Sequence, residues 1–361
     1  MFSIPPDTLS QKILLNGLQG IGPVTVRRLR EAFNHDLAAA LRANPGQLRV
    51  LKGMSEAMIQ SLTQRAFDWA KEKESAEQKG FKIISNETAE WPSALEHLWD
   101  PPLVLYTEGT ALPTARSVAI IGSRHCTPYG TQLAHHFARD LAKLGWCIIS
   151  GLARGIDCAA HEGALAADGQ TVAVLGHGID QTYPPEAIKL RRRMIEHGSI
   201  LSEFPLGRPA DRQSFPQRNR IVAALAQAII VIETDKDGGS MITARFASDL
   251  GKTLCVVPGR VDSTQSRGCH ALIRDGATLV TSVDDILAEL GEARGQLLIP
   301  LEQIPPDEAK WLHHFRGGSI HDAESLAEAA QCPLADAASA LTFLEIQGRL
   351  VRRFDGRHER S

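Results

Sequence analysis

The fold of this chain is decided by the sequence Val118-Ala-Ile-Ile-Gly-Ser-Arg124 and by a similar stretch, Cys147-Ile-Ile-Ser-Gly-Leu-Ala-Arg-Gly-Ile-Asp157. In both, a short apolar run ends at glycine and small polar residues and is followed by a helical pattern, which is typical of a buried parallel strand that leads into a helix. Glycine lets backbone N–H groups approach a ligand, and the start of a helix favours an anion. Arg124 and Arg154 add positive charge at the two turns. The pattern predicts a phosphate-binding α/β domain.

The composition is that of a globular protein with several domains. The chain has 361 residues, of which 43% are hydrophobic and 22% charged, which favours well-buried cores over disorder. The net charge of −3 gives no sign of a nucleic-acid partner, so such a role must come from local clusters of charge. Two basic clusters exist, one from Arg208 to Arg220 and one in the tail from Arg349.

Cysteine spacing and apolar runs indicate which classes of protein to set aside. The six cysteines form no Cys-x-x-Cys pair and no cysteine–histidine knuckle, so no zinc site and no other metal site is expected. The N-terminus has no signal-peptide pattern, and no apolar run approaches the ~20 residues of a membrane span. These features predict a soluble, cytoplasmic protein.

Four segments are predicted along the chain. Residues 1–75 are expected to be helical, and the glycine-rich turn Gly17-Leu-Gln-Gly-Ile-Gly-Pro23 resembles a helix-hairpin-helix motif, which grips a nucleic-acid phosphate with backbone N–H groups. A small helical domain in which these glycines only make a tight turn is the alternative. Residues 76–290 form the α/β domain, residues 291–306 a linker, and residues 307–361 a second small domain.

Strands and helices alternate in the α/β segment, which predicts a mainly parallel sheet with helices on both faces. The expected strands are Lys82–Ser85, Leu103–Thr107, Ser117–Ile121, Cys147–Ser150, Thr171–Leu175, Ser199–Ser202, Ala228–Ile232, Thr253–Val257 and Thr278–Val280. Ligands of such sheets bind outside the carboxyl ends of the strands, near the switch in strand order. The binding site is therefore expected where the glycine-rich turns gather.

The last segment resembles a winged helix. Three helical patterns, at Asp307–Phe315, Asp322–Ala330 and Leu334–Ile346, precede a basic ribbon from Arg349 to Arg357. The helix Leu334–Ile346 presents small side chains and no Arg, Asn or Gln early in its length, so we do not expect it to read bases. A winged helix of this kind could bind duplex DNA or another protein.

No catalytic machinery is predicted. Asp157 and His161 are four residues apart and share a helix face, as an acid–base pair would, but a helix-capping aspartate with a hydrogen-bonded histidine is the favoured interpretation. The patterns of a nucleophile elbow, of an ATP-binding loop and of a dinucleotide fingerprint are all absent. Neither a cofactor nor an enzymatic activity is therefore expected.

The run Arg212-Gln-Ser-Phe-Pro-Gln-Arg-Asn-Arg220 combines positive charge with one aromatic ring. This composition suits single-stranded nucleic acid, because arginines pair with phosphates and a ring stacks on a base. The alternative is structural: Phe215 packs into the core, and Arg218 and Arg220 cap a helix or pair with Glu203 or Glu233. A second phosphate cradle is predicted at Asp237-Gly-Gly-Ser-Met-Ile-Thr-Ala-Arg245, where glycines and Ser240 open another helix.

Seven ordered motifs resemble those of the DprA (Smf) family of DNA-processing proteins of bacterial natural transformation. They are Gly122-Ser-Arg124; Ser150-Gly-Leu-Ala-Arg-Gly-Ile-Asp157 with His161; Ala173-Val-Leu-Gly176 with Gly178-Ile-Asp180 and Tyr183-Pro184; Ser202-Glu203 with Pro205-Leu-Gly207; Phe215-Pro216 with Arg218-Asn-Arg-Ile221; Gly239-Ser240 with Ile242-Thr-Ala-Arg245; and Val257-Pro-Gly259 with Gly268-Cys269 and Leu272-Ile273. The resemblance is close from Trp91 to Ala277 and looser on either side.

The resemblance implies a Rossmann-like homodimer that binds incoming single-stranded DNA, protects it and loads the recombinase RecA onto it, displacing single-strand-binding protein, without catalysing a reaction. The single-strand pocket that it implies consists of Gly122, Ser123, Arg124, Gly151, Arg154, Gly155, Arg212, Phe215, Arg218, Asn219, Arg220, Gly239, Ser240 and Thr243.

Two other functions compete with this one. A Rossmann-like nucleotide phosphoribohydrolase would bind a nucleoside monophosphate at the same strand ends. Such enzymes have the pattern Pro-Gly-Gly-x-Gly-Thr-x-x-Glu, and the corresponding region of this chain, Asp237–Arg245, has neither the proline nor the glutamate. A winged-helix transcription regulator with a ligand-sensing core would require tight binding to a specific duplex.

Overall fold

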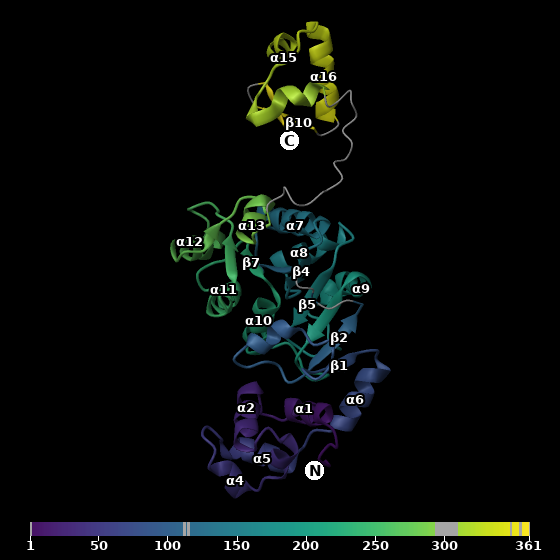
Figure 1. Cartoon of the computed structure of the whole chain (residues 1–361), viewed down its shortest axis with the longest axis vertical. Coiled ribbons are helices and arrows are strands. Elements are labelled where there is room, and N and C mark those ends of the chain that lie inside the picture. Colours follow the sequence, from purple (N-terminus) through teal and green to yellow (C-terminus); the bar gives the residue numbers. More distant parts are fainter. Residues whose placement is uncertain are drawn as a thin grey trace. The chain divides into compact units, whose positions relative to one another are not determined.

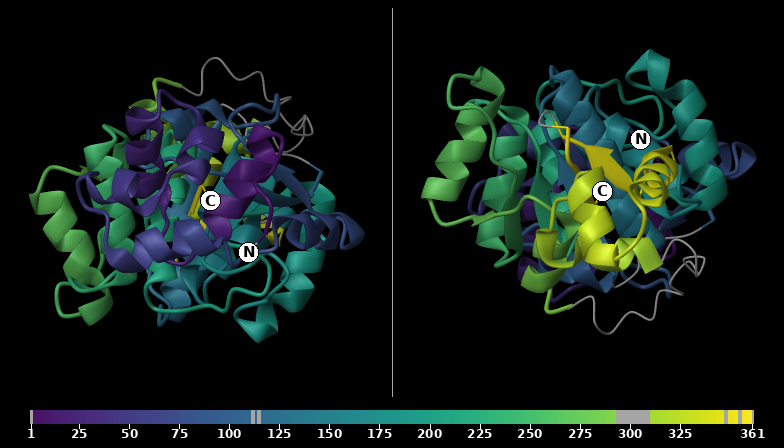
Figure 2. Two further views of the ribbon diagram at one scale, coloured as in Figure 1. Left: turned by 90° about the horizontal axis from the view of Figure 1, so that it is seen from below. Right: turned by 90° about the horizontal axis from the view of Figure 1, so that it is seen from above.

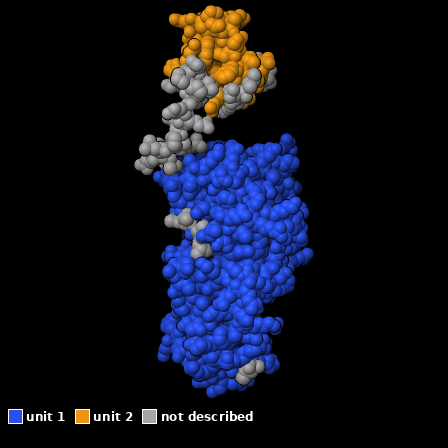
Figure 3. Space-filling model, turned by 90° about the vertical axis from the view of Figure 1, so that its right-hand side faces the viewer, with its two compact units in different colours: residues 1–294 blue, residues 295–361 orange. Residues whose placement is uncertain are grey.

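The computed structural model of the chain describes residues 2–110, 113, 116–292, 310–346, 349–353 and 356–360. The chain forms two compact units, Met1–Arg294 and Gly295–Ser361 (Figures 1 and 3). The helical N-terminal residues and the α/β residues both belong to the first unit. The division into four segments stays a prediction, and most of the expected linker, from residue 293 onward, lies outside the described residues.

The first unit is built on a nine-stranded sheet with the order β1-β2-β6-β5-β4-β3-β7-β8-β9 among the described residues. From β6 to β9 neighbouring strands are parallel, while β2 pairs antiparallel with both β1 and β6. The strands are β1 (Lys82–Ile84), β2 (Leu105–Gly109), β3 (Ser117–Ile121), β4 (Cys147–Ser150), β5 (Thr171–Leu175), β6 (Ser199–Ser202), β7 (Ala228–Val231), β8 (Thr253–Val256) and β9 (Thr278–Leu279). The mainly parallel, Rossmann-like sheet predicted from the sequence is confirmed.

The expected strand bounds differ most at β2, which begins and ends two residues later than predicted. The reason is its antiparallel pairing with β6, which extends to Gly109 opposite Ser199. At Gly109 the backbone φ is +114°, and a Cβ atom there would lie 2.3 Å from the carbonyl oxygen of Gly198. Only glycine fits this close approach of two strands.

The order of the strands reverses at β3. The chain proceeds from β3 through β4 and β5 to β6 on one side, then returns so that β7, β8 and β9 follow on the other side of β3. The connection after β3 therefore leads to one side of the sheet, and the connection after β7 leads to the other. Doubly wound sheets bind ligands at the carboxyl ends of two such strands.

Helices cover both faces of the sheet (Figure 1). Successive side chains of β3 point to opposite faces. Val118 and Ile120 pack with α7 (Pro128–Lys143), α8 (Ile156–Leu165) and α13 (Val283–Glu289). Ala119 and Ile121 pack on the other face with α10 (Ser214–Leu225), α11 (Gly239–Asp249) and α12 (Arg267–Arg274). Both views in Figure 2 place the green segment with α11 and α12 at one edge of this unit.

Beyond β5, the helix α9 (Ile188–His197) packs with Tyr106 and Ile200. Short 3₁₀ helices complete the connections, at η1 (Ser93–His97), η2 (Pro185–Ala187) and η3 (Thr264–Ser266). No helix in the described part of the chain is both long and apolar enough to span a membrane.

In the described residues before the sheet, the helices are α1 (Thr8–Gly17), α2 (Pro23–Ala32), α3 (Leu37–Arg42), α4 (Pro45–Arg49), α5 (Glu56–Gln64) and α6 (Trp69–Gln78). Their apolar faces form a separate core around Leu14, Val26 and Leu29. Contacts of polar and charged side chains join them to loops of the α/β part. Asn16 Nδ2 donates to the carbonyl oxygen of Glu203 at 2.8 Å, and the guanidinium of Arg27 lies 3.8 Å from the ring centroid of Trp99.

The second unit contains η5 (His313–Gly318), α15 (Ala323–Ala330), α16 (Leu334–Ile346) and the antiparallel strands β10 (Leu350–Arg352) and β11 (His358–Arg360). Leu326, Leu341, Leu344 and Leu350 form its small core. The order of two helices and a hairpin is the one predicted for a winged helix. The first expected helix, Asp307–Phe315, lies partly outside the described residues.

Candidate nucleic-acid interface

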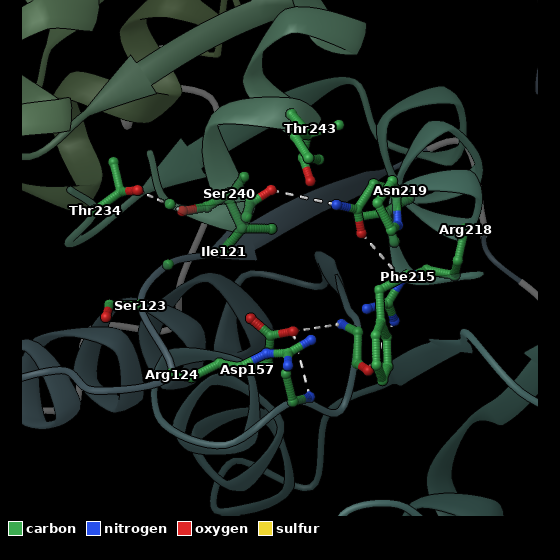
Figure 4. A pocket seen from close by; sticks show the side chains of 18 of the residues that line it. Ile121, Ser123, Arg124, Asp157, Phe215, Arg218, Asn219, Thr234, Ser240 and Thr243 are labelled. Atoms are coloured by element: carbon green, nitrogen blue, oxygen red, sulfur yellow. Dashed lines mark hydrogen bonds between the residues drawn. The ribbon is translucent and has the colours of Figure 1, made fainter. Parts of the chain in front are cut away.

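A cavity of about 550 Å³ opens at the carboxyl ends of β3, β4 and β7, at the switch in strand order. Its walls are the turn after β3, the turn after β4, the first half of α10, and the loop that leads from β7 into α11. In Figure 4 the labelled side chains of α10 lie on one side of the cavity, with Ser240 and Thr243 of α11 above and Arg124 and Asp157 below. The fold thus gathers segments that are more than 100 residues apart in the sequence.

Most of the site residues predicted from the sequence line this cavity. They are Gly122, Ser123, Arg124, Gly151, Arg212, Phe215, Arg218, Asn219, Gly239, Ser240 and Thr243. The three others, Arg154, Gly155 and Arg220, lie elsewhere. Sequence reasoning did not include His125, Thr234 or Asp235, which also line the cavity. Thr234 and Asp235 lie in the loop just after β7, so the rule that ligands bind at strand ends could have identified them.

Arg220 is the clearest departure from the expected site. Its guanidinium is buried and makes two hydrogen bonds of 2.7 Å to the carboxylate of Glu203, and its Nε lies 3.2 Å from a carboxylate oxygen of Asp100. The structural alternative for Arg220, a pair with Glu203, is the one that the structure shows. Because two residues rotate a helix by about 200°, Arg220 points away from the surface that carries Arg218.

The helix α10 therefore presents two different surfaces. Phe215, Arg218 and Asn219 face the cavity at the switch in strand order. Gln213, Gln217 and Arg220 instead line a second cavity, of about 760 Å³, which the glycine turn from Gly17 to Pro23 closes on its far side.

Gly155 has a structural role at the start of α8. Its φ is +79°, and a Cβ atom would lie 2.4 Å from the carbonyl oxygen of Ser123. Glycine thus allows the turn after β4 to pack directly on the turn after β3. Gly155 shapes the wall of the cavity without lining it.

Arg218 is a buried cation at the cavity wall. Its Nη1 donates to the carbonyl oxygens of Gly151, at 2.7 Å, and Val174, and its Nε donates to Asn219 Oδ1 at 3.1 Å. Burial lowers the pKa of Arg218 to about 10, against the opposing effect of the Asp157 carboxylate. The side chain thus remains charged at neutral pH. Nη2 makes no hydrogen bond to any residue that the structure describes, so it can donate to an acceptor in the cavity.

Asp157 supports the turn after β4. Its carboxylate accepts hydrogen bonds from the backbone N–H groups of Gly151, at 3.1 Å, and Ala153, at 3.3 Å. Burial raises the pKa of this carboxyl, while nearby Arg218 lowers it. Asp157 therefore holds the loop N–H groups in place and is neither a helix cap nor the partner of a catalytic base.

The expected hydrogen bond between Asp157 and His161 is not present. His161 Nδ1 lies 2.6 Å from Thr171 Oγ1 on β5, and His161 Nε2 is buried without a partner among the described residues. Burial lowers the pKa of His161 to about 3. This histidine is a neutral core residue at physiological pH and takes no part in the cavity.

His161 is expected to make the fold sensitive to acid. In the unfolded chain a histidine has a pKa of about 6.5, so below that pH the unfolded state gains a proton that the folded state does not bind. The stability that comes from keeping His161 neutral is fully present above pH 6.5 and decreases as the pH falls toward 3. Acidification from pH 7 to pH 5 should therefore lower the free energy of unfolding by about 2 kcal/mol through this residue.

Urea unfolding of the wild type and of His161→Gln at pH 7 and pH 5 measures this effect. The variant should be less stable at pH 7 but lose less stability on acidification. Equal losses in both proteins would show that His161 is protonated in the folded state.

Arg124 and Phe215 are in contact at the mouth of the cavity. The guanidinium carbon of Arg124 lies 4.5 Å from the centroid of the Phe215 ring, a cation–π contact. Phe215 is half-buried, so it is not a core residue, and Arg124 and Arg212 are both exposed. Within the described ranges neither arginine forms an ion pair with a carboxylate. Both cations are therefore available to an anionic ligand.

The start of α11 closes the cavity on the opposite side. Ser240 Oγ donates to Thr234 Oγ1 at 2.7 Å, and Asn219 Nδ2 donates to the carbonyl oxygen of Gly239 at 3.3 Å. No side chain caps the first N–H groups of α11 at Gly238, so these groups and the helix dipole favour an anion here. Over the described residues, no group of His, Cys, Asp and Glu suited to a metal ion is found.

Residues 82–291 match the family model of DNA recombination-mediator protein A, a range that covers more than half of the chain and contains the whole cavity. The chain belongs to this family. The resemblance of the sequence motifs to the DprA (Smf) family of DNA-processing proteins is thereby confirmed.

Two relatives with similar sequences bear the two names of this family, Smf and DprA. Protein Smf of Synechocystis is 34% identical over 284 residues, which are 76% of this chain and 70% of that protein. DNA processing protein DprA of Bacillus subtilis is 35% identical over 225 residues, 62% of this chain and 76% of that protein.

Two solved structures are also similar. The structure of DNA processing protein A from Streptococcus pneumoniae has a TM-score of 0.67 at 31% identity and covers 78% of this chain and 98% of its own. DNA processing protein A from Helicobacter pylori, studied for its single-stranded DNA binding mode, has a TM-score of 0.53 at 35% identity and covers 58% of this chain and 95% of its own.

Proposed function

We propose that this family member binds single-stranded DNA in the cavity at the switch in strand order, protects it, and loads RecA onto it during natural transformation and DNA recombination. The proposal is carried by one observation: three arginines, Arg124, Arg212 and Arg218, surround the cavity together with one accessible aromatic ring, Phe215. The proposed partners are single-stranded DNA, RecA, a second copy of the chain and single-strand-binding protein.

The chemistry of the cavity suits a single strand better than a duplex. Arg124 and Arg212 can pair with phosphates, and the Phe215 ring can stack on an unpaired base. The uncapped start of α11 provides a further anion site. The similarity to the Helicobacter pylori protein, studied for its single-stranded DNA binding mode, supports the same ligand class for this chain.

Binding without catalysis is proposed. The buried carboxylate in the wall, Asp157, is occupied by two loop N–H groups. The buried cation that acts on its charge, Arg218, is a guanidinium that stays protonated. The cavity therefore provides positive charge and hydrogen-bond donors in place of an acid–base pair.

Fluorescence anisotropy of a labelled oligo-dT and of a matching duplex, each titrated with the protein at two salt concentrations, tests the proposal. We expect preference for the single strand and a steep salt dependence, because each phosphate contact releases condensed counterions. Equal or stronger binding of the duplex would contradict it and move the function to the second unit. Absence of binding together with release of adenine from AMP would favour a nucleotide hydrolase.

The RecA step needs its own assay. RecA filament formation on oligo-dT covered with single-strand-binding protein should be faster when the protein is present. A rate that does not depend on the protein would contradict loading while leaving DNA binding intact.

Replacing Phe215 with alanine should weaken binding of oligo-dT by about 1–3 kcal/mol, the contribution of one base stacked on an aromatic side chain. Because stacking releases no counterions, the slope of log K against log salt should stay unchanged. Titrations at several salt concentrations measure both quantities, with Phe215→Tyr as the control that keeps a ring. A smaller slope would instead show that the ring mainly supports Arg124, which lies 4.5 Å from its centroid.

A further inference from the structure

From the mouth of the cavity, aromatic and cationic side chains continue outward in a row, called here the outer row: Arg124 and Phe215, which line the cavity, and then Tyr183 and Arg154. The rings of Phe215 and Tyr183 lie 5.7 Å apart between centroids, and the guanidinium carbon of Arg154 lies 5.7 Å from the centroid of Tyr183. Arg124 covers the other end, 4.5 Å from Phe215. Cation, ring, ring and cation therefore follow one another over the surface.

The outer row follows the carboxyl edge of the sheet. Arg124 comes after β3, Arg154 after β4, and Tyr183 in the connection after β5, and these three strands are neighbours in the order β5-β4-β3. The row thus extends from the cavity over the carboxyl ends of β4 and β5. Tyr183 and Arg154 do not line the cavity itself.

The far end of the outer row holds an anion already. Arg154 Nε donates to one carboxylate oxygen of Glu186 and Nη2 donates to the other at 3.2 Å. Both side chains are about half exposed, at 47% and 58%. This two-pronged contact of a guanidinium with two oxygens is also the geometry in which arginine binds a phosphate. Glu186 therefore occupies the position that a phosphate group of a ligand would take.

An exposed ion pair of this kind is easily replaced. Pairs between exposed side chains contribute little to stability, because water and salt screen them and both side chains must be ordered. A phosphate that reaches Arg154 needs only to displace the carboxylate of Glu186. Tyr183, three residues before Glu186 and half-buried, offers the exposed part of its ring to a base at the same place.

We propose that a single strand bound in the cavity continues along the outer row, where one base packs against Tyr183 and one phosphate displaces Glu186 from Arg154. The inference rests on the proposed function, since it extends the same binding site. It assigns Tyr183 as a base-contacting residue and Glu186 as a carboxylate that competes with the strand. A short oligonucleotide that fills only the cavity should not sense either residue, whereas a longer one should.

The test compares Glu186→Gln with wild type in full-length protein, using labelled oligo-dT of increasing length. For long oligonucleotides the variant should bind about two- to fivefold more tightly, the range expected for one exposed ion pair. For the shortest oligonucleotide that still binds, the two proteins should be equal. Glu56→Gln is the matched control, because Glu56 makes the same two-pronged pair with exposed Arg49 at 2.7 and 3.0 Å, away from the sheet. Its binding should not differ from wild type.

Two further variants separate a binding role from a structural one. Arg154→Gln should reduce the salt slope for long oligonucleotides by about 0.7, the value for one phosphate contact on a single strand, and leave the short one unchanged. Tyr183→Leu should weaken binding of long oligonucleotides alone, while Tyr183→Phe should restore it. If Tyr183→Leu weakens short and long oligonucleotides equally, the ring serves only to support Phe215 and its assignment is overturned.

Failure of this inference is distinguishable from failure of the proposed function. If wild type binds oligo-dT but Glu186→Gln and Arg154→Gln match it at every length and salt concentration, the strand does not follow the outer row and only this inference is overturned. If wild type does not bind oligo-dT at all, the proposed function is overturned and the inference with it.

Discussion

Replacing Arg220 with methionine is expected to lower the free energy of unfolding by about 3–5 kcal/mol, the cost of leaving a buried charge without its partner. The guanidinium of Arg220 makes two 2.7 Å hydrogen bonds to the buried carboxylate of Glu203 and reaches Asp100 as well. Methionine keeps much of the volume but removes the charge. Glu203 would then remain buried with no cation to compensate it.

Urea unfolding of the full-length protein measures this loss. Arg260→Met is the control, because Arg260 makes an ion pair of 2.8 Å with Asp262 in which both side chains are exposed, and its removal should cost less than about 1 kcal/mol. Adding Glu203→Gln to Arg220→Met should recover part of the stability. An effect of Arg220→Met no larger than that of Arg260→Met would show that water reaches the buried pair.

Replacing Arg124 with alanine should weaken oligo-dT binding by about 1.5–3 kcal/mol, or roughly 10- to 150-fold, the value of a hydrogen bond between charged groups. Arg124 follows the glycine turn after β3 and is exposed at the mouth of the cavity. Unlike Arg154 or Arg220, it makes no ion pair within the described residues that a ligand would first have to break.

Anisotropy titrations at fixed and varied salt measure the effect of this substitution. The salt slope should fall by about 0.7 for the one lost phosphate contact. Arg139→Ala is the control, since Arg139 is a half-exposed arginine on α7 outside the cavity, and it should bind as wild type does. An unchanged dissociation constant for Arg124→Ala would remove this residue from the site.

The fold was predictable because its signals are local. Each buried strand is a short apolar run followed by a turn, and Ser117–Ile121, Cys147–Ser150, Thr171–Leu175 and Ser199–Ser202 begin and end where the sequence predicts. β2 was less well placed because its last residues depend on pairing with β6, about 90 residues further along the chain. The sequence pattern of one strand contains no information about such a partner.

The site could be predicted only in part, for a related reason. Arg218 and Arg220 are two residues apart, and the sequence offers Glu203 as a partner to either of them. Their roles diverge because Glu203, 17 residues from Arg220, and Asp100, 120 residues away, both lie beside the helix face that carries Arg220. The spacing of Asp157 and His161 correctly places both on α8, but the histidine forms its hydrogen bond with Thr171 on β5 and not with Asp157. Helical spacing tells which residues share a face and not what lies opposite them.

The two surfaces of α10 restrict how this segment can change. Each residue turns an α-helix by about 100°, so inserting or deleting one residue near Gln213 would rotate every later side chain by that angle. Phe215, Arg218 and Asn219 would leave the cavity at the same time as Arg220 left Glu203. Single substitutions can alter one surface and spare the other, but a change in length would disrupt both. Among relatives with the same two surfaces, this helix should keep its length.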